Sequence, residues 1–328
     1  GEDDPYVQNF IWMCLTCGRC EERCPSYVTF SEFVRKLRAR ALRKGKDGFF
    51  SHGGILHTIM EVMSAPALKQ NRTGWLTEDI KTSSYGDILY FVGCVPYFNV
   101  YFKNLELDLI KIPESAVKVL NHLGVEPVIL ENERCCGHDL YWAGKEDEFK
   151  KLVSECSKEL MNKGIKEIVT SCPECLYTLK ELYPTFVKDF NVKVTHIYDF
   201  IKGRLKKDDL NPLSAKVTYQ DSCRLVRYVN MVELPRELIN KFPETEFIEM
   251  PSSRSGSTCC GNSAWVGCGR HSKDIQLKRI DEAKSTGADL LITSCPKCLI
   301  HLQCTMKDIE EENRMPVKDM MEVIYGLL

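Results

Sequence analysis

Ten of the 17 cysteines form one five-cysteine pattern that occurs twice along the chain. Each copy has a single cysteine, then a Cys-Cys-Gly triplet, then a Cys-Pro-x-Cys element, at nearly equal separations. Such thiol pairs in a large chain point to metal or redox chemistry. The repeat therefore predicts two metal clusters in equivalent frames. Their ligands are predicted to be Cys94, Cys135, Cys136, Cys172 and Cys175 in the first copy, and Cys223, Cys259, Cys260, Cys295 and Cys298 in the second.

A different cysteine run lies near the N-terminus. Cys14, Cys17, Cys20 and Cys24, followed by Pro25, have the C-x2-C-x2-C-x3-C-P spacing of bacterial ferredoxins, which predicts a cubane [4Fe–4S] cluster. The alternative is a structural zinc knot. In two-cluster ferredoxins the fourth cysteine ligates the other cluster. Cys24 therefore either completes its own cluster or serves one that is held with a partner.

Composition limits the class of protein. A chain of 328 residues with 44% hydrophobic and 27% charged residues has room for at least two domains. Its net charge of −2 gives no signal for nucleic acid, and no run reaches the length of a membrane span. The start, Gly1 to Asp4, lacks a signal-peptide pattern and an initiator Met, so we expect a trimmed start and a cytoplasmic protein. A disulfide framework is the alternative use of the thiols, but it suits small secreted chains.

Strand and helix patterns alternate around the repeated cysteines. This alternation predicts an α/β fold of two pseudo-symmetric, Rossmann-like parallel-sheet repeats, plus a small helical ferredoxin-like N-terminal segment. We expect a ferredoxin-like segment at 1–50, a connection at 51–86, a first cysteine-rich domain at 87–206 and a second at 207–328. The predicted strands are 87–93, 126–130, 168–170, 216–220, 246–250 and 289–293, and the predicted helices are 114–123, 145–162, 234–241 and 273–284.

The cysteines fall at the ends of these elements. Cys94, Cys172, Cys223 and Cys295 follow strands, and ligands collect at the carboxyl ends of parallel strands. Proline favours the first position of a helix, so the two Cys-Pro-x-Cys elements place a cysteine at each N-cap and a second one turn later. We expect the positive helix ends to stabilise these thiolates. The sequence thus predicts two metal sites on one shared rim.

Other polar residues and thiols have two interpretations each. His138 could protonate a leaving thiolate or be a loop histidine. Arg224 and Arg227 could bind a substrate anion or be solvated. A helix after Thr29, with a capping box to Glu32, is predicted to have an apolar face that includes Phe33 and a basic face that includes Arg35 and Arg38. The basic face could bind an acidic partner or be solvated. We expect buried packing roles for Cys156, Cys304 and Cys268, with a place beside a cluster as the alternative for Cys268.

The double pattern resembles the cysteine-rich CCG domain of the heterodisulfide reductase family, in its B-type and fused D-type subunits. The resemblance covers roughly 87–304, and residues 12–45 are similar to the second ferredoxin motif of a C-type subunit. D-type chains usually carry two such motifs, and this chain has one. The resemblance implies that each complete set holds a noncubane [4Fe–4S] cluster. It also implies that the pair of clusters cleaves a disulfide, in methanogens coenzyme M–S–S–coenzyme B, with one thiolate product taken by each cluster.

We therefore expect an iron–sulfur oxidoreductase that cleaves a small-molecule disulfide, with Cys94, Cys136, Cys223 and Cys260 most directly involved. The cubane cluster would supply electrons, and the partners would be a flavin-containing A-type subunit or a membrane cytochrome. The alternative is an electron-transfer subunit of a quinone-linked dehydrogenase or of respiratory sulfur metabolism. A zinc-stabilised scaffold is the third hypothesis.

Overall fold

Two parallel sheets form the centres of the two halves of the chain. The computed structural model describes residues 4–46, 48–161 and 164–328. The first sheet has the order β1-β2-β3, and the second has the order β5-β4-β6-β7, with every pairing parallel. This arrangement confirms the predicted α/β class. The strands are β1 (Ile88–Tyr90), β2 (Glu167–Thr170), β3 (Lys193–His196), β4 (Lys216–Gln220), β5 (Glu246–Phe247), β6 (Leu290–Thr293) and β7 (Val317–Asp319).

The sheets correspond to each other more closely than the sequence indicated. The predicted strand 126–130 is reduced to Val128, which forms parallel bridges beside β1 in the position that β5 holds beside β4. Its N–H donates to Ile88 O (2.9 Å), and its carbonyl accepts from Tyr90 N (3.0 Å). Each half also gains an edge strand that the sequence did not predict, β3 or β7. Both are short and have an exposed lysine, so they lack a long apolar run.

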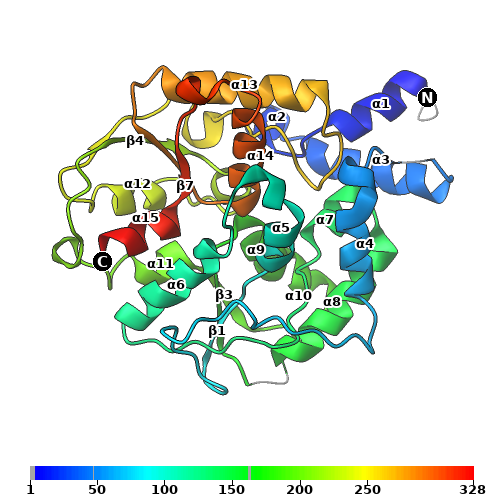
Figure 1. Cartoon of the computed structure of the whole chain (residues 1–328). Helices are drawn as coiled ribbons and strands as arrows, with labels where there is room; N and C mark the ends of the chain where they lie inside the picture. Colours follow the sequence, from blue (N-terminus) through cyan, green and yellow to red (C-terminus); the bar gives the residue numbers. More distant parts are fainter. Residues whose placement is uncertain (1–3, 47, 162–163) are drawn as a thin grey trace.

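Helices surround both sheets (Figure 1). The predicted helix 145–162 is α8, and its residue Asn162 lies outside the described residues. Among the described helices, none reaches the length and hydrophobicity that a bilayer span requires. The first half contains α5 (Val95–Tyr101), η2 (Lys103–Leu105), α6 (Lys111–His122), α7 (His138–Ala143), α8 (Glu146–Met161), α9 (Pro173–Tyr177), η3 (Thr178–Leu182), α10 (Tyr183–Phe186) and α11 (Ile197–Ile201). The second contains η4 (Lys207–Asp209), η5 (Arg224–Tyr228), α12 (Leu234–Ile239), η6 (Arg254–Gly256), α13 (Arg270–Lys284), α14 (Pro296–Met306), η7 (Glu311–Asn313) and α15 (Met320–Leu327).

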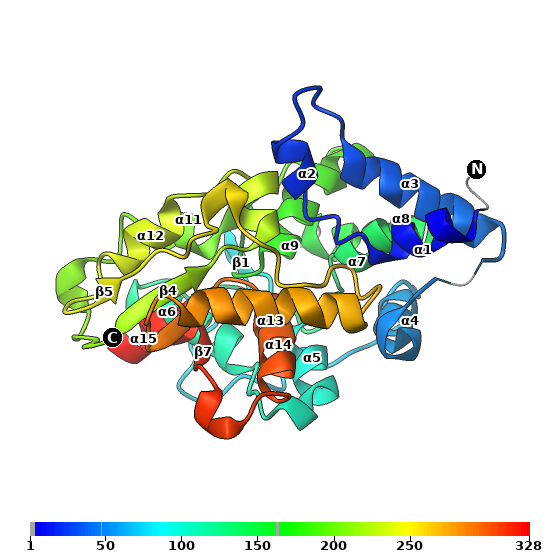
Figure 2. The ribbon, with the colours of Figure 1, turned by 90° about the horizontal axis from the view of Figure 1, so that it is seen from above.

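The N-terminal helices lie on the outside of the molecule and contact both halves (Figure 2). They are α1 (Pro5–Met13), α2 (Arg19–Glu22), α3 (Phe30–Arg43), η1 (Ser51–Gly54) and α4 (Ile55–Val62). Two predictions for α3 are wrong. Thr29 makes no capping hydrogen bond with its side chain. Arg35 and Arg38 are buried, because Glu146 accepts from Arg35 and the carbonyl groups of Ile11 and Trp142 accept from Arg38. Phe33 is exposed.

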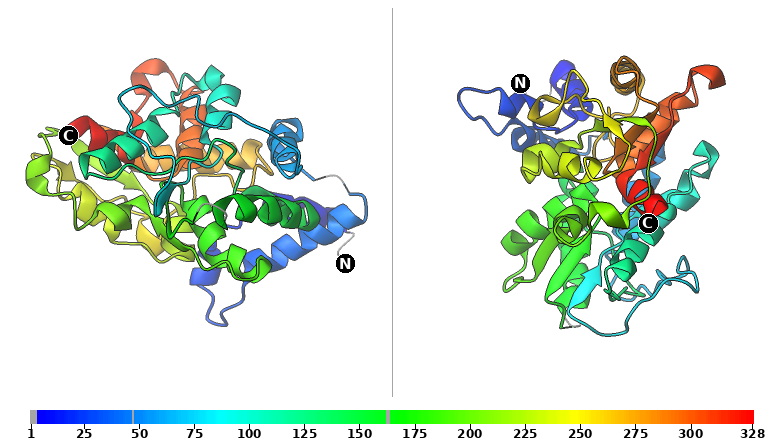
Figure 3. Two further views of the ribbon diagram at one scale, coloured as in Figure 1. Left: turned by 90° about the horizontal axis from the view of Figure 1, so that it is seen from below. Right: turned by 90° about the vertical axis from the view of Figure 1, so that its left-hand side faces the viewer.

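The last helix of each half packs against a helix of the other half. α15 of the second half packs against α6 of the first, and α11 of the first half packs against α12 of the second. Figure 3 shows the red C-terminal helix beside the cyan first-half segment in both views. One apolar cluster includes Leu120 from α6, Ile201 from α11, Leu238 from α12 and Ile324 from α15. This packing holds the carboxyl ends of the two sheets in one fixed relation.

His196 makes the stability of this core sensitive to acid. It lies at the N-cap of α11, where Nδ1 accepts from Tyr198 N (3.3 Å) and Nε2 donates to Ser171 O (3.2 Å). Burial lowers the pKa of His196 to about 3. The neutral ring therefore stabilises the fold above the ordinary histidine pKa, and this stabilisation is lost as the pH falls toward the folded-state value. We expect a loss of about 1 kcal/mol between pH 6.5 and 5.5 from this residue.

Urea unfolding at several pH values tests this expectation. The variant His196→Gln should have a flatter dependence of unfolding free energy on pH over this interval. The control is His122→Gln, because His122 lies on the exposed side of α6 and should leave the slope unchanged. An identical slope in the His196 variant and the parent protein would contradict the assignment.

Candidate functional site: two buried thiol sets and the charges between them

The first cysteine set lines a cavity with about 350 Å³ of empty space, a figure that includes its open mouth. Cys94 follows β1 at the N-cap of α5, and Cys172 follows β2 at the N-cap of α9. The five thiols form a continuous series of contacts. Its first pair, Cys94 Sγ and Cys135 Sγ, is 2.9 Å apart. The order of the series is Cys94, Cys135, Cys136, Cys175 and Cys172.

The second set repeats this arrangement. Cys223 follows β4, and Cys295 follows β6 at the N-cap of α14. The predicted position at the carboxyl ends of the strands is therefore present in both halves. The thiols again form one series, in the order Cys223, Cys259, Cys260, Cys298 and Cys295.

A left-handed glycine shapes each Cys-Cys-Gly loop. Gly137 has φ of 86° and Gly261 has φ of 88°. A Cβ atom on Gly137 would lie 2.8 Å from Phe149 Cδ2, and one on Gly261 would lie 2.7 Å from Ser272 O. Any side chain there would clash and would also strain the backbone. Glycine thus lets two adjacent cysteines present both thiols to one site.

The thiols of each set cannot all ionise without a cation. Hydrogen bonds from Cys136 and Cys94 hold the pKa of Cys135 well below its usual value, and the same pairing raises the pKa of Cys94 and Cys136. Contacts with neighbouring thiols also raise the pKa of Cys175 and Cys298, against our expectation that the helix ends would stabilise these thiolates. A buried set of five soft thiol donors around a cavity fits an iron–sulfur group. All 17 cysteines are free thiols in this structure.

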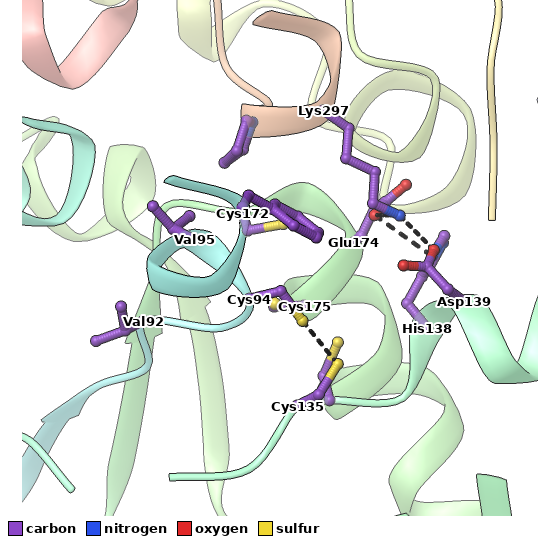
Figure 4. A pocket seen from close by; sticks show the side chains of 13 residues that line it. Val92, Cys94, Val95, Cys135, His138, Asp139, Cys172, Glu174, Cys175 and Lys297 are labelled. Carbon is purple, nitrogen blue, oxygen red and sulfur yellow. Dashed lines mark hydrogen bonds and ion pairs between the residues drawn. The ribbon is translucent and has the colours of Figure 1, made fainter. Parts of the chain in front are cut away.

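A buried charge cluster joins the two sets. Glu174 occupies the x position of the first Cys-Pro-x-Cys element, and Lys297 occupies the x position of the second. Lys297 Nζ lies 2.6 Å from Glu174 Oε2 and also pairs with Asp139 (Figure 4). Burial alone would lower the pKa of Lys297, but the two carboxylates outweigh it and raise that pKa well above its usual value. The cluster therefore fixes a charged lysine where the two halves meet.

His138 also belongs to this cluster. Its Nε2 accepts from Arg224 Nε at 2.9 Å, so the proton resides on Nδ1, which lies 2.9 Å from Asp139 Oδ1. Burial lowers the pKa of His138, which favours the neutral ring. His138, Asp139 and Glu174 have the spacing of a metal site, but Lys297 pairs with both carboxylates. His138 thus lines the first cavity, and both of its ring nitrogens already have hydrogen-bond partners. Its role in catalysis stays a prediction.

Arg224 and Arg227 hold the N-terminal run in place. Arg224 donates to Thr16 O (2.7 Å), and Arg227 Nε donates to Cys17 O (2.6 Å). The Arg224 side chain is buried and bonded through all three of its nitrogens. This geometry does not favour an anion site at Arg224, because all three of its nitrogens are already bonded, whereas Arg227 Nη2 is buried without a hydrogen-bond partner, so an anion site at Arg227 stays a prediction. Nothing in the sequence indicates that Arg224 pairs with the N-terminal loop, because Thr16 lies more than two hundred residues from Arg224 in the chain.

The four cysteines of the N-terminal run have two kinds of surroundings: three interact with one another, and the fourth interacts with backbone N–H groups. Cys14, Cys17 and Cys20 interact electrostatically with one another. Cys24 interacts instead with the backbone N–H groups of residues 26–28, which lower its pKa. The Cys17 thiol also hydrogen bonds with Cys259 and packs against the second cysteine set. The run therefore adjoins the second set.

Sequence reasoning missed the residues that support the sets. Glu133 accepts hydrogen bonds from Val92 N (2.9 Å) and Gly93 N (2.7 Å), which ties the first Cys-Cys-Gly loop to the turn before Cys94. The position of Glu133 two residues before Cys135 was the available signal. Cys156 is buried, as predicted. Cys304 is partly buried and packs against the apolar core, whereas Cys268 is exposed, so a buried packing role is wrong for Cys268.

Comparisons with known proteins match these features. A family model described as a cysteine-rich domain, CCG, matches residues 88–180 and 217–303. The D-type subunit of the dihydromethanophenazine:CoB–CoM heterodisulfide reductase from Methanosarcina acetivorans is 30% identical over 296 residues, which cover 87% of this chain and 70% of that one. Its counterpart from Methanosarcina barkeri is 27% identical over 327 residues, covering 96% and 77%.

More distant similarities extend the comparison. The EtfAB:quinone oxidoreductase of Syntrophomonas wolfei is 28% identical over 344 residues, which cover 96% of this chain and 46% of that protein. A crystal structure of a hypothetical protein from Helicobacter pylori superposes with a TM-score of 0.54 at 12% identity, over 83% of this chain and 57% of that one, which supports the fold alone. With both repeats matched, the chain belongs to the cysteine-rich CCG-domain family, in the group of the heterodisulfide reductase B- and D-type subunits.

Proposed function

We propose that the chain is the disulfide-cleaving subunit of a redox complex. Each five-cysteine set holds one noncubane [4Fe–4S] cluster, and the N-terminal run contributes to one cubane [4Fe–4S] cluster. A disulfide takes up two electrons and two protons between the sets, its S–S bond breaks, and two thiols leave. The electrons come from a one-electron donor through partner subunits.

The observation that carries this proposal is the ion pair between the two Cys-Pro-x-Cys elements. Glu174 and Lys297 are each within two residues of cluster ligands, and their contact brings both sets to one interface. Two complete sets on one interface suit a substrate with two sulfur atoms, because each set then serves one of them. The similarity to heterodisulfide reductase subunits supports the same reaction class.

The residues around the first cavity have separable tasks. When bound, the clusters supply reducing electrons and thiophilic iron. Val92, Val95 and Phe98 form an apolar wall that limits water at the thiols. Lys297 holds a fixed positive charge at the cavity, and His138 retains its proton at Nδ1 through Asp139. These groups exclude water from the cavity and keep a fixed positive charge beside it while the substrate sulfur is reduced.

The N-terminal run supports an electron entry beside the second set. Three of its thiols are grouped, and Cys17 contacts Cys259 of that set. Cys24 lies apart, which suits a ligand shared with a cluster of a partner or of another segment. Suitable partners are a flavin-containing subunit or a membrane cytochrome. The 17 free thiols suit a reducing compartment such as the cytoplasm.

A viologen assay tests the proposed function. The anaerobically reconstituted protein should oxidise reduced methyl viologen when a heterodisulfide is added, with two viologens consumed per disulfide. Iron and labile sulfide are measured on the same sample, and zinc without iron would support a scaffold instead. A fully metallated sample that turns over no disulfide would contradict the proposal.

A second candidate is an electron-transfer subunit of a quinone-linked complex. The similarity to an EtfAB:quinone oxidoreductase favours it. This alternative predicts the same cluster content and reduction by viologen, but no thiol product from any disulfide. Quantifying thiols after the assay therefore separates the two candidates.

A further inference from the structure

A segment without helix or strand packs against the first cysteine set. Residues 63–76, here called the strap, follow α4, in a region where the sequence predicted only a connection. Gln70 Nε2 donates to Glu133 O (3.2 Å), and Cys135 N lies 3.3 Å from Met63 Sδ. The strap therefore contacts the loop that carries Cys135 and the cysteine after it.

Arg134 holds the strap from the side of this loop. Its side chain is buried, and Nη1 donates to Met63 O and to Ala65 O (2.8 Å). Nη2 donates to Leu68 O (3.3 Å). A segment without a hydrogen-bond ladder of its own needs such partners for its buried carbonyl groups. One guanidinium group thus fixes the first part of the strap beside the Cys-Cys-Gly loop.

A buried ion pair between the strap and the loop fixes the turn before Cys94. Arg72 is 4% exposed and Glu133 is 1% exposed, with Arg72 Nη2 3.7 Å from Glu133 Oε1. Glu133 accepts from Val92 N (2.9 Å) and Gly93 N (2.7 Å), and Arg72 Nη2 donates to Gly93 O. Both backbone polar groups of Gly93 are therefore bound by this pair.

The place of Gly93 determines the geometry of the first set. A Cβ atom on Gly93 would lie 2.9 Å from Cys175 Sγ, so this peptide is already close to one thiol. The next residue is Cys94, whose Sγ lies 2.9 Å from Cys135 Sγ (Figure 4). A movement of the Gly93 peptide would therefore separate Cys94 from Cys135 or press the backbone against Cys175.

The strap also contacts the helix that follows Cys94. Tyr97 lies on α5, and Arg72 Cζ is 4.8 Å from the centroid of its ring. The Tyr97 hydroxyl donates to Gln70 Oε1 (2.5 Å). Arg72 and Gln70 thus connect the Cys-Cys-Gly loop, the turn before Cys94 and the start of α5.

The second set has different contacts at the equivalent place. Ser257 corresponds to Glu133, because each lies two residues before a Cys-Cys-Gly triplet. The Ser257 carbonyl accepts from Arg227 Nη1 (3.1 Å), and Arg227 Nε donates to Cys17 O. The loop of the second set is therefore held through Arg227 and the N-terminal run, whereas the loop of the first set is held by the strap.

We propose that Arg72 and Glu133 are positioning residues for the first cluster alone: they hold the Gly93–Cys94 turn so that Cys94 stays within reach of the iron. The proposal rests on the cluster assignment in the proposed function. Substitutions of residues that orient metal ligands typically lower metal affinity about 10- to 100-fold. Loss of the ion pair should therefore weaken retention of the first cluster and leave the second unchanged.

Iron release to a ferrous chelator, measured anaerobically on the full, reconstituted chain, tests this proposal. The Cys260→Ala and Cys136→Ala backgrounds should retain only the first and only the second of the two clusters, respectively. Iron bound by the N-terminal run is present in both backgrounds, so the difference between them isolates the two sets. In the Cys260→Ala background, Arg72→Met should speed iron release about 10- to 100-fold. In the Cys136→Ala background the same substitution should leave the rate unchanged.

Two further variants separate positioning from a general loss of stability. Arg72→Lys keeps a positive charge beside Glu133 but loses the planar fork, so it should speed release by a smaller factor, again in the Cys260→Ala background alone. Asn71→Ala is the matched control, because Asn71 is exposed and its side chain bonds within the strap to Thr73. It should leave both rates unchanged.

An unchanged rate in the Cys260→Ala background, or equal acceleration in both backgrounds, would overturn the proposal. If Arg72→Met does not fold, Arg72→Lys decides by the same comparison. Backgrounds that lose no iron relative to the parent protein would overturn the cluster assignment on which the proposal rests. A parent protein that holds both clusters but turns over no disulfide would overturn the proposed function and leave the positioning role standing.

Discussion

Replacing Cys136 by alanine is expected to remove the first cluster and abolish disulfide reduction. Cys136 is the middle member of the first thiol series, between Cys135 and Cys175, so its loss divides the set. The variant should lose about four irons per chain, the content of one [4Fe–4S] cluster. Cys260→Ala should do the same in the second set, where Cys260 lies between Cys259 and Cys298. Iron, labile sulfide and thiol release measured on one sample check both.

Cys156→Ala is the matched control for these variants. Cys156 is buried on α8, and its thiol lies 3.9 Å from Arg134 O, outside both thiol series. Burial raises the pKa of its thiol to about 12, in keeping with a neutral packing group. Iron content should equal that of the parent protein. Retention of both clusters in Cys136→Ala or Cys260→Ala would refute the ligand assignment.

Lys297→Met is expected to destabilise the protein strongly. The substitution keeps much of the side-chain volume but removes the only cation that pairs with both Asp139 and Glu174 among the described residues. The two buried carboxylates would then keep only His138, whose Nδ1 lies 2.9 Å from Asp139 Oδ1 and 3.4 Å from Glu174 Oε2. Breaking a buried ion pair by removing one partner costs about 3–5 kcal/mol. Denaturant unfolding should show this loss.

Two companion variants test the cause of that loss. Glu174→Gln keeps the pairing of Lys297 with Asp139 and should therefore cost less than Lys297→Met. Lys307→Met removes an ion pair with Glu106 whose carboxylate is largely exposed, so the unfolding midpoint should change little. Equal destabilisation by Lys297→Met and Lys307→Met would show that the buried cluster has no special role.

The sequence alone predicted most of the placement of the thiols, because local rules govern it. Cysteine spacing identified ten thiols in two sets, and the proline of each Cys-Pro-x-Cys element placed Cys172 and Cys295 at helix N-caps. Strand and helix alternation predicted parallel sheets, whose carboxyl ends carry Cys94 and Cys223. Each of these features depends on residues within one or two elements, so periodicity and spacing reveal it.

Contacts between distant segments required the tertiary structure. The short edge strands β3 and β7 are stabilised by the neighbouring strand rather than by their own residues. No local pattern indicates that Arg224 is bonded to Thr16 or that Cys17 contacts Cys259. These pairs depend on how the helices of the two halves pack together and close around the N-terminal run.

The repeated motif therefore determined which residues can hold metal, and the fold decided what surrounds them. Glutamate and lysine at equivalent places in the two motifs look like neutral variation in sequence. They form a buried ion pair only because the pseudo-symmetric packing turns both helix starts toward one interface. The bonds of Arg224 to Thr16 likewise exist only in three dimensions. Burial converts polar atoms that would be satisfied by water into groups that require a partner.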